Sequence, residues 1–341
     1  MTLCIFFKSR GLEIVEERGG RMFPKSNKSS DVIDIIYNEL ISRGITIYFN
    51  ETVISLIQEN NIIKEIITTK QKMCSDAVIM ATGGIYYPHT GSDGLGFDIL
   101  KKLGVTLIPP VPALTSMLFD DTSQELPEGL SLKNVSLSII NTNDLVIAND
   151  FGEMIFTNNG ISGPIVLSLS SKINRKLLNE TLFASIDLKP ALPIEVLEDR
   201  IINMVPLYGK QQVKHIIPKL TVKKMTSKIL LQSNINPCKQ LANLTSEDIR
   251  KLANSLKGVK YQISSLDTER AVVTAGGVDV KQINPKTMQS KIIDNLFFAG
   301  EIIDVDALTG GYNLQFAFSS GVTAGRGVCE YINKTEDIIN K

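Results

Sequence analysis

The chain has 341 residues, a length that predicts two or three domains rather than one. Its 36 Lys and Arg residues balance its 36 Asp and Glu residues, which argues against nucleic acid or an anionic membrane as a partner. A hydrophobic content of 43% and a charged content of 21% indicate a globular protein.

The sequence contains no run of about 20 apolar residues, so it predicts no membrane span. The segment 1–8 has no basic region before its apolar residues and does not read as a secretory signal. The four cysteines lie far apart, as in proteins of a reducing cytoplasm, and two histidines are too few for a His-rich metal site. We therefore expect a cytoplasmic protein without a metal centre.

The first part of the chain predicts alternating helices and strands. The expected elements, in order, are a helix ending at Gly11, a strand over 12–15, a polar loop over 16–30, a helix over 31–44 and strands over 45–49, 53–57 and 62–68. The last two strands are expected to form a hairpin.

A buried strand is predicted over 76–81, because this continuous apolar run is typical of a parallel sheet. It runs into Thr82-Gly83-Gly84, and α/β folds bind ligands at the carboxyl ends of such strands. A helix is expected over 95–103. Three prolines within 109–112 then favour an extended connector that stops regular structure, and we place a domain boundary there.

The middle of the chain predicts a small barrel or sandwich followed by a helical part. Its expected strands cover 136–140, 145–148, 153–156, 165–169 and 181–187. The pattern from 193 to 256 is helical, with seven lysines and no acidic residue between Ile201 and Ser246. These lysines could bind phosphate-rich partners, and a solvated helical face explains them at least as well.

The last part of the chain returns to α/β character. A second apolar strand over 292–299 runs into Gly300-Glu301, and Thr309 to Gln315 opens a helix lined with small residues. Two strands that run into glycines therefore bracket a middle of different composition. This pattern predicts one α/β domain interrupted by an insertion.

Two features near this end of the chain are candidate ligand contacts. The helix start at Gly310-Gly311 exposes backbone N–H groups that favour an anion, or a flavin that gains negative charge on reduction. Glu301 could accept hydrogen bonds from ribityl hydroxyls, and Asp304 is a similar acid. An ordinary glycine turn and solvated loop acids are the alternatives. Tyr312 could donate a proton, or it could be a packing tyrosine.

Several motifs together resemble those of a bacterial flavoprotein family. They are Ala81-Thr82-Gly83-Gly84 with Tyr87 to Gly94, Phe156-Thr157 with Gly160 to Pro164, Val273 to Val278 with Asn284 to Lys291, Phe298 to Asp306, Thr309 to Gln315, and Arg21 to Pro24. On these motifs, which cover nearly the whole chain, the protein is identified as a member of the aminoacetone oxidase-like, or BaiN-like, NAD(P)/FAD-dependent oxidoreductases.

The resemblance implies a three-layer α/β, Rossmann-like FAD/NAD(P)-binding domain over 1–110 and 271–341. It implies an insert over 111–270, with a β-barrel part to about 190 and a helical part over about 191–258. The backbone of Val53 would face the adenine, and Glu301 would lie near the ribityl chain. The cofactor contacts that the resemblance implies are Val53, Ala81, Thr82, Gly83, Gly84, Gly300, Glu301, Asp304, Gly310, Gly311, Tyr312, Asn313, Leu314 and Gln315.

The sequence lacks the family's strand, GxGxxG turn and helix, which hold the pyrophosphate of FAD. Three explanations compete: a chain truncated by a misplaced start codon, one half of a split flavoprotein, or a protein that has lost FAD and kept its insert for binding. We favour the first. A sheet without that strand is expected to expose apolar edges.

The function implied by the resemblance is FAD-dependent hydride transfer between a small organic substrate and flavin N5, with NAD(P)H as one candidate reductant. Family members differ between amine oxidation and reduction of conjugated ketones, and no residue here decides between them. Glu301 and Tyr312 are candidates for an acid or base by position only. The alternative is a fragment without independent catalysis, acting with a partner chain that supplies the missing βαβ unit, or as a binding protein.

Overall fold

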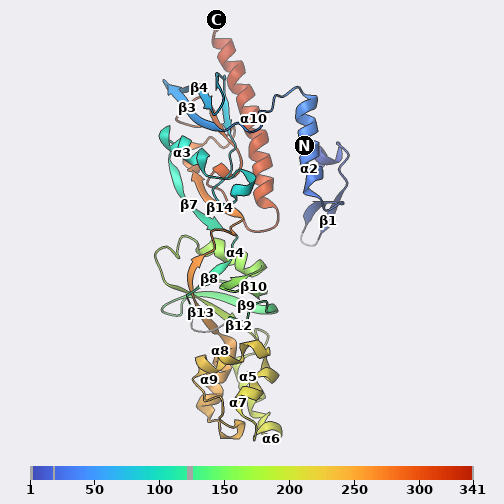
Figure 1. The fold of residues 1–341 in the computed structure, drawn as a ribbon, viewed down its shortest axis with the longest axis vertical. Helices are drawn as coiled ribbons and strands as arrows, with labels where there is room; N and C mark the ends of the chain where they lie inside the picture. Colours follow the sequence, from blue (N-terminus) through green and yellow to red (C-terminus); the bar gives the residue numbers. More distant parts are fainter. Residues whose placement is uncertain (1–2, 18–19, 121–125, 340–341) are drawn as a thin grey trace. The chain divides into compact units, whose positions relative to one another are not determined.

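The computed structural model describes residues 3–17, 20–120 and 126–339, so the first two residues of the predicted N-terminal segment lie outside it. The chain divides into two compact units (Figure 1). The first unit combines Met1–Pro110 with Thr274–Lys341, and the second is Val111–Val273. Within the described residues, no helix is both long and apolar enough to cross a membrane.

The first unit opens with two helices that flank a β-hairpin. They are α1 (Leu3–Lys8), β1 (Ile14–Glu17), β2 (Arg21–Pro24) and α2 (Ser29–Ser42). The predicted helices are confirmed, but the prediction that 16–30 is a loop is wrong in part. Arg21–Pro24 pairs antiparallel with β1, and a four-residue strand this polar carries too little pattern to be recognised.

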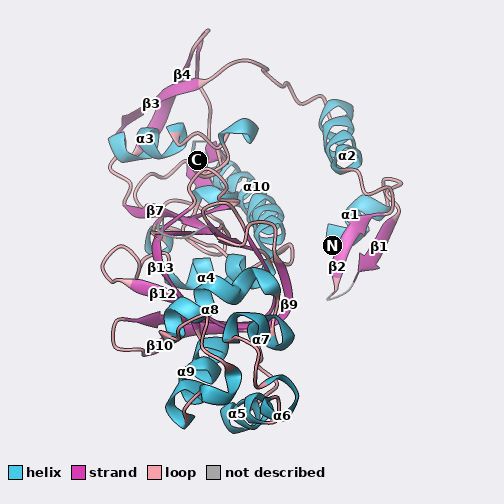
Figure 2. Ribbon diagram, turned by 60° about the horizontal axis from the view of Figure 1, so that its bottom comes forward, coloured by secondary structure: helices cyan, strands magenta, loops and turns pink. Residues whose placement is uncertain are grey.

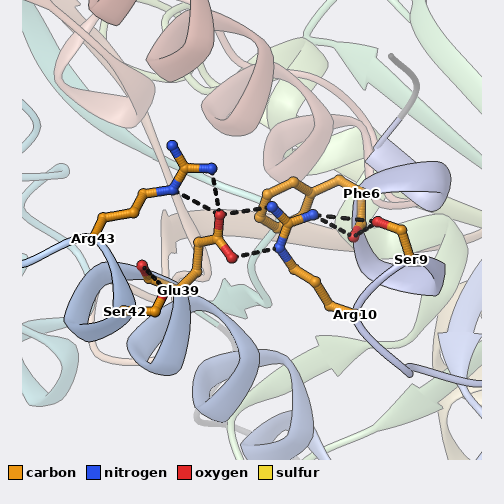
Figure 3. Close-up of polar contacts among 6 residues, drawn as sticks. All are labelled: Phe6, Ser9, Arg10, Glu39, Ser42 and Arg43. Carbon is orange, nitrogen blue, oxygen red and sulfur yellow. Dashed lines mark hydrogen bonds and ion pairs between the residues drawn. The ribbon is translucent and has the colours of Figure 1, made fainter.

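A carboxylate between two guanidinium groups fixes α1 to α2 (Figure 3). Arg10 donates to both oxygens of Glu39, at 2.8 and 2.6 Å, and Arg43 donates to the same carboxylate at 2.7 Å. These hydrogen bonds lower the pKa of Glu39 to about 2. The Arg10 guanidinium also lies 3.9 Å from the ring centre of Phe6.

The predicted strand over 45–49 is wrong, because this segment forms no strand in the structure. β-rich composition alone does not make a strand without a neighbour to pair with. Tyr48 and Phe49 are 56% and 63% exposed, and α2 contains no fully buried residue. This part of the first unit therefore presents apolar side chains to solvent.

The predicted hairpin is confirmed as β3 (Val53–Glu59) and β4 (Ile62–Thr68), with a short β5 (Lys72–Met73) beside β4. β6 (Val78–Met80) and β15 (Leu296–Phe298) pair in parallel. The amide of buried Asn295 bonds Ile63 N and O at 2.8 and 2.9 Å. This side chain thereby joins the hairpin to the parallel pair.

The first unit contains seven further elements within its described residues. They are η1 (Pro88–Thr90), α3 (Leu95–Lys102), β7 (Leu107–Ala113), β14 (Val273–Val278), η4 (Val280–Gln282), η5 (Gly300–Ile302) and α10 (Tyr312–Ile339). The prolines of 109–112 do not stop regular structure as predicted, because β7 runs through them and pairs with β14. The φ angle of proline suits an extended edge strand.

The second unit contains a closed six-stranded barrel with strand order β10-β11-β8-β13-β12-β9 (Figure 2). Its strands are β8 (Met117–Phe119), β9 (Ser131–Asn141), β10 (Val146–Phe156), β11 (Gly160–Ser162), β12 (Leu182–Asp187) and β13 (Val259–Leu266). The two strands predicted over 145–148 and 153–156 form one continuous strand, β10. A closed barrel leaves no strand edge without a partner.

Helices complete the second unit, as the sequence predicts for 193–256. They are α4 (Pro164–Ile173), α5 (Ile194–Ile202), α6 (Val205–Tyr208), α7 (Val213–Leu220), η2 (Lys223–Met225), α8 (Thr226–Ser233), η3 (Leu241–Asn243) and α9 (Ser246–Lys257). The predicted strand over 165–169 is wrong, because these residues belong to α4. Pro164 occupies the first turn, and Ile165, Leu169 and Ile173 recur at helical spacing on its buried face.

Candidate functional site

The two parallel strands of the first unit end side by side, and each runs into a glycine turn. Met80 is in register with Phe298, so Thr82-Gly83-Gly84 and Gly300-Glu301 follow at the same end of the pair. Ligands of open α/β sheets bind outside the carboxyl ends of the strands. The structure therefore brings together the two turns that the sequence predicts as cofactor contacts.

Glu301 is the centre of the hydrogen bonds that join these turns. Its Oε1 accepts from Thr274 N on β14 at 2.6 Å, and the backbone of Gly84 also donates to its carboxylate. Burial raises the pKa of Glu301, and the hydrogen bonds from Thr274 and Gly84 oppose that rise. Glu301 is thus a fixed, half-buried carboxyl group rather than a solvated loop acid.

Thr274 fixes the turn that follows β6. Its side chain is 1% exposed, and its Oγ1 accepts from Ile85 N at 2.9 Å and Tyr86 N at 3.3 Å. Burial raises the pKa of the Tyr86 phenol, so this group stays neutral around pH 7. Sequence reasoning missed Thr274 and Tyr86 as site residues. The available signal was one hydroxyl in the otherwise apolar Val273-to-Val278 strand.

Gly84 is required by close packing at this point. A Cβ built on it would lie 2.5 Å from Thr274 Cβ, closer still to Thr274 Oγ1, and 3.2 Å from Glu301 Cδ. A Cβ on Gly83 would lie 2.5 Å from Ser92 Oγ, and the φ of Gly83 is +74°. The two glycines therefore let the turn lie against β14 and against the loop that leads to α3.

The start of α10 is the third part of the candidate site. Gly310 and Gly311 have φ angles of +131° and +88°, and a Cβ on Gly311 would meet only open space. The Asn313 amide exchanges two hydrogen bonds of 2.8 Å with the backbone of Ala307, which fixes the approach to the helix. The first N–H groups of α10 are thus open to a ligand.

Apolar side chains are exposed at this helix start. Tyr312 is 62% exposed and Leu314 is 66% exposed. Gly300 lies at the same helix, where its N–H donates to Ser320 Oγ at 2.9 Å. Gln315 N bonds Gly311 O in the first turn. An open helix N-terminus beside exposed apolar groups suits a flat ligand with polar edges.

Two predicted contacts lie away from these hydrogen bonds. Val53 begins β3 and pairs with Thr68, and within the described residues it makes no hydrogen bond to the two turns. Asp304, which follows η5, donates its N–H to Val278 O at 3.0 Å, so its backbone lies beside the end of β14. Ala81 and Thr82 are exposed after β6, and a Cβ on Gly96 would collide with Thr82 Oγ1.

The residues present fit the flavin and ribityl side of FAD. The carboxyl of Glu301 and the backbone of the two turns are polar groups suited to sugar hydroxyls, and the open start of α10 suits the ring edge that gains negative charge on reduction. The sequence contains no GxGxxG, so the usual pyrophosphate cradle is not among these residues. In the described part of the chain, no cluster of His, Cys, Asp or Glu could hold a metal ion.

One surface depression lies in the second unit. Its volume is about 560 Å³, and α8, α9 and β13 line it. Its lysines are already paired: Lys251 with Glu247, Lys257 with Asp187 and Lys260 with Asp144, each at 2.6 Å. Because carboxylates of the protein neutralise these lysines, their charges do not indicate a ligand site in this depression.

Comparison with known proteins is consistent with the first unit's geometry. The family described as "HI0933-like protein Rossmann domain" matches residues 1–327. The chain is 28% identical over 335 residues to a 3-dehydro-bile acid delta(4,6)-reductase of Clostridium scindens, covering 95% of this chain and 79% of the relative. It is also 28% identical over 316 residues to a ribosomal RNA dihydrouridine synthase of Haemophilus influenzae, covering 91% and 75%.

Among solved structures, the quinol fumarate reductase subunit FrdA of E. coli aligns with a TM-score of 0.45 and 13% identity. The alignment covers 96% of this chain and 55% of that one, so the chain spans about half of its length. A score at this level does not establish a shared fold. The family match over almost the whole chain confirms the predicted Rossmann-like fold class. The chain therefore belongs to the HI0933-like Rossmann family, a family of FAD-binding oxidoreductases.

Proposed function

We propose that this protein is an FAD-dependent reductase that transfers a hydride to a carbon–carbon double bond conjugated to a carbonyl. The observation that carries the proposal is the joining of Gly84, Thr274 and Glu301 at the carboxyl ends of β6 and β15, beside the open start of α10. When bound and reduced, the flavin would supply the hydride from N5 of its isoalloxazine ring.

The names of the relatives support the choice of reaction. A delta(4,6)-reductase of a 3-dehydro bile acid and a dihydrouridine synthase both saturate double bonds, and each of these bonds is conjugated to a carbonyl. Neither relative is described as an aminoacetone oxidase, so we propose reduction rather than amine oxidation. NAD(P)H is the reductant that we propose for regenerating the cofactor.

Each residue of the site has a proposed role. Glu301 and the two glycine turns hold the ribityl chain, and the N–H groups at the start of α10 donate to the ring edge that gains negative charge. Tyr312 and Leu314 cover the ring and exclude water. Tyr86, whose backbone N–H donates to Thr274 Oγ1 and whose phenol is neutral, is a candidate proton donor to the carbon next to the carbonyl.

The first test is FAD uptake by the purified full chain, followed by flavin fluorescence. A steroid with a 3-oxo group and a 4,5 double bond is then mixed anaerobically with the reduced protein. We expect stoichiometric uptake and loss of the enone absorbance in step with flavin oxidation. Tyr86→Phe should slow that step without changing FAD affinity. Tight uptake with a flavin that only oxygen reoxidises would contradict the proposed reaction.

A second candidate is a flavoprotein that works only with a partner strand, as in a split enzyme. Within the described strands, β6 pairs only with β15, and Ile79 at its centre is 41% exposed. Such an edge accepts a further strand. The candidate predicts that FAD is taken up only when a strand-GxGxxG-helix polypeptide is co-expressed, and uptake by the chain alone would dismiss it.

The four cysteines are unpaired, which suits a reducing compartment. We propose the cytoplasm as the site of action.

A further inference from the structure

We propose that Thr274 is a positioning residue of the candidate site: its hydroxyl donates its hydrogen to Glu301 and orients that carboxylate to accept from a ligand hydroxyl. Thr274 lies on β14 (Figure 1) and is 1% exposed, so it acts through Glu301 rather than by touching the ligand. The proposal rests on the proposed function, in which Glu301 holds the ribityl chain. It deepens that function by assigning the residue that holds the carboxyl group in place.

The hydrogen bonds of Thr274 Oγ1 leave one direction for its hydrogen. This oxygen accepts from Ile85 N at 2.9 Å and from Tyr86 N at 3.3 Å. A threonine hydroxyl has two acceptor lone pairs and one donor hydrogen, so the turn after β6 uses both lone pairs. The Thr274 side chain is also hydrogen-bonded to the Glu301 carboxyl. In that hydrogen bond the hydroxyl must be the donor, and Glu301 must be the acceptor.

Glu301 therefore accepts from three donors that belong to two segments of the chain. On the β14 side, Thr274 donates through its backbone N–H, at 2.6 Å to Oε1, and through its hydroxyl. On the other side, the backbone of Gly84 donates to the same carboxyl. An ionised carboxylate accepts at about four lone-pair sites, so three donors leave a site for one more. A hydroxyl of the ligand is a suitable fourth donor.

The charge state of Glu301 depends on these donors. Burial raises its pKa, and the hydrogen bonds from Thr274 and Gly84 lower it. β14 carries no charged residue. The ionisable groups of the turn after β6, the loop after η5 and the start of α10 are Tyr86, Asp304, Asp306 and Tyr312. Because burial and hydrogen bonding cause the shift, loss of the Thr274 hydroxyl should raise the pKa of Glu301 further.

A structural role of Thr274 makes a different prediction. If its hydroxyl served only as an acceptor for the two backbone N–H groups, its removal would destabilise the turn and leave the titration of Glu301 unchanged. Two substitutions separate these roles. Thr274→Val keeps the shape of the side chain and removes the hydroxyl, whereas Thr274→Ser keeps the hydroxyl and removes a buried methyl group.

The test follows the titration of Glu301 in the full chain without flavin. Glutamate is isotope-labelled at its side-chain carboxyl and observed by carbon NMR, and Glu301→Gln identifies the signal by removing it. Thr274→Val should move this titration to higher pH, because a donor to the ionised form is lost. Thr274→Ser should titrate like the unchanged chain, since it keeps that donor.

FAD affinity gives a second readout. The hydroxyl donates to a charged group, and loss of such a hydrogen bond weakens binding about 10- to 100-fold. Quenching of flavin fluorescence near neutral pH should therefore show weaker FAD binding to Thr274→Val and unchanged binding to Thr274→Ser. If the unchanged chain takes up no FAD, the proposed function fails, and the titration still decides the role of Thr274.

Thr115→Val is the matched control. Thr115 is fully buried in the second unit, and its hydroxyl donates to the Asp267 carbonyl at 2.6 Å. This variant also loses a buried hydrogen bond, so it should unfold at a lower temperature than the unchanged chain, as should Thr274→Val. The titration of Glu301 and the affinity for FAD should not change. The comparison separates a lost donor to Glu301 from a general loss of stability.

Three results would overturn the proposal: an unchanged Glu301 titration in Thr274→Val, an equal shift in Thr274→Ser or Thr115→Val, or equal FAD affinity in Thr274→Val and the unchanged chain. Thr274→Ala provides the comparison if the valine variant does not fold, because it differs from Thr274→Ser only in the hydroxyl. Identical titration curves of Glu301 in the alanine and serine variants would then refute the assigned donor.

Discussion

Gly84→Ala tests the packing at the centre of the candidate site. The new methyl group would lie 2.5 Å from Thr274 Cβ and 3.2 Å from Glu301 Cδ, and both neighbours are held by hydrogen bonds. Thr274 is 1% exposed and belongs to a strand whose six residues are all buried, so it cannot move away freely. The methyl must therefore separate the turn after β6 from Glu301.

Overpacking of this kind costs about 1–3 kcal/mol, or about 5- to 150-fold in the unfolding equilibrium. The φ of Gly84 lies outside the range that favours glycine, so the cost comes from the contact rather than from the backbone. Urea unfolding should show a lower midpoint with an unchanged slope. We also expect weaker FAD binding, because the carboxyl of Glu301 is displaced.

Gly321→Ala is the matched control. Gly321 lies inside α10, where a Cβ would meet nothing within 4 Å. An alanine there should stabilise the helix by about 0.5–1 kcal/mol. If Gly84→Ala unfolds within a few tenths of a kcal/mol of the unchanged chain while Gly321→Ala stabilises it, the packing argument is refuted.

Three other substitutions test the first unit. Asn295→Ala leaves the N–H and C=O of Ile63 unpaired in the core, so urea unfolding should show a loss of about 2–5 kcal/mol; a smaller loss would mean that water replaces the amide. Because the pKa of Glu301 is raised in the folded state, the free energy of unfolding falls as pH rises from 4.5 through that pKa. The stability of Glu301→Gln relative to the unchanged chain should therefore increase over this window. A difference in unfolding free energy between the two proteins that does not change with pH would contradict this expectation. The lowered pKa of Glu39 stabilises the fold above pH 4.5, and this stabilisation is lost as pH falls towards about 2. The hydrogen-exchange protection factors of α2 should therefore fall in that window, but not in Glu39→Gln; constant protection factors in the unchanged chain would contradict it.

The sequence predicted the candidate site where local pattern decides structure. A short apolar run that ends in glycine marks a buried strand and its turn, and both such runs, before Gly83 and before Gly300, are strands that end at the same edge. The helix start at Gly310-Gly311 was likewise visible, although α10 begins three residues after Thr309. Each of these features depends on neighbours in the sequence.

The remaining features depend on partners far along the chain. Thr274 acts on Ile85 and Tyr86, almost 190 positions earlier, and only the pairing of the fold reveals that contact. The segment 165–169 is apolar enough for either a strand or a helix. It forms part of α4, because Pro164 suits the first turn of a helix and the buried residues lie on one helical face.

One expectation about the sheet follows from physics and is confirmed. A strand edge without a neighbour was expected to expose apolar groups, and Ile79 on β6 is 41% exposed, whereas all three residues of β15 are buried. The difference arises because β15 lies between β6 and the segment around Gln289, which bridges to Phe297. Within the described strands, a further strand could therefore pair with β6, whereas the other side of β15 is already occupied. A strand added there would bury Ile79 and would end beside the glycine turns, at the edge where the proposed cofactor lies.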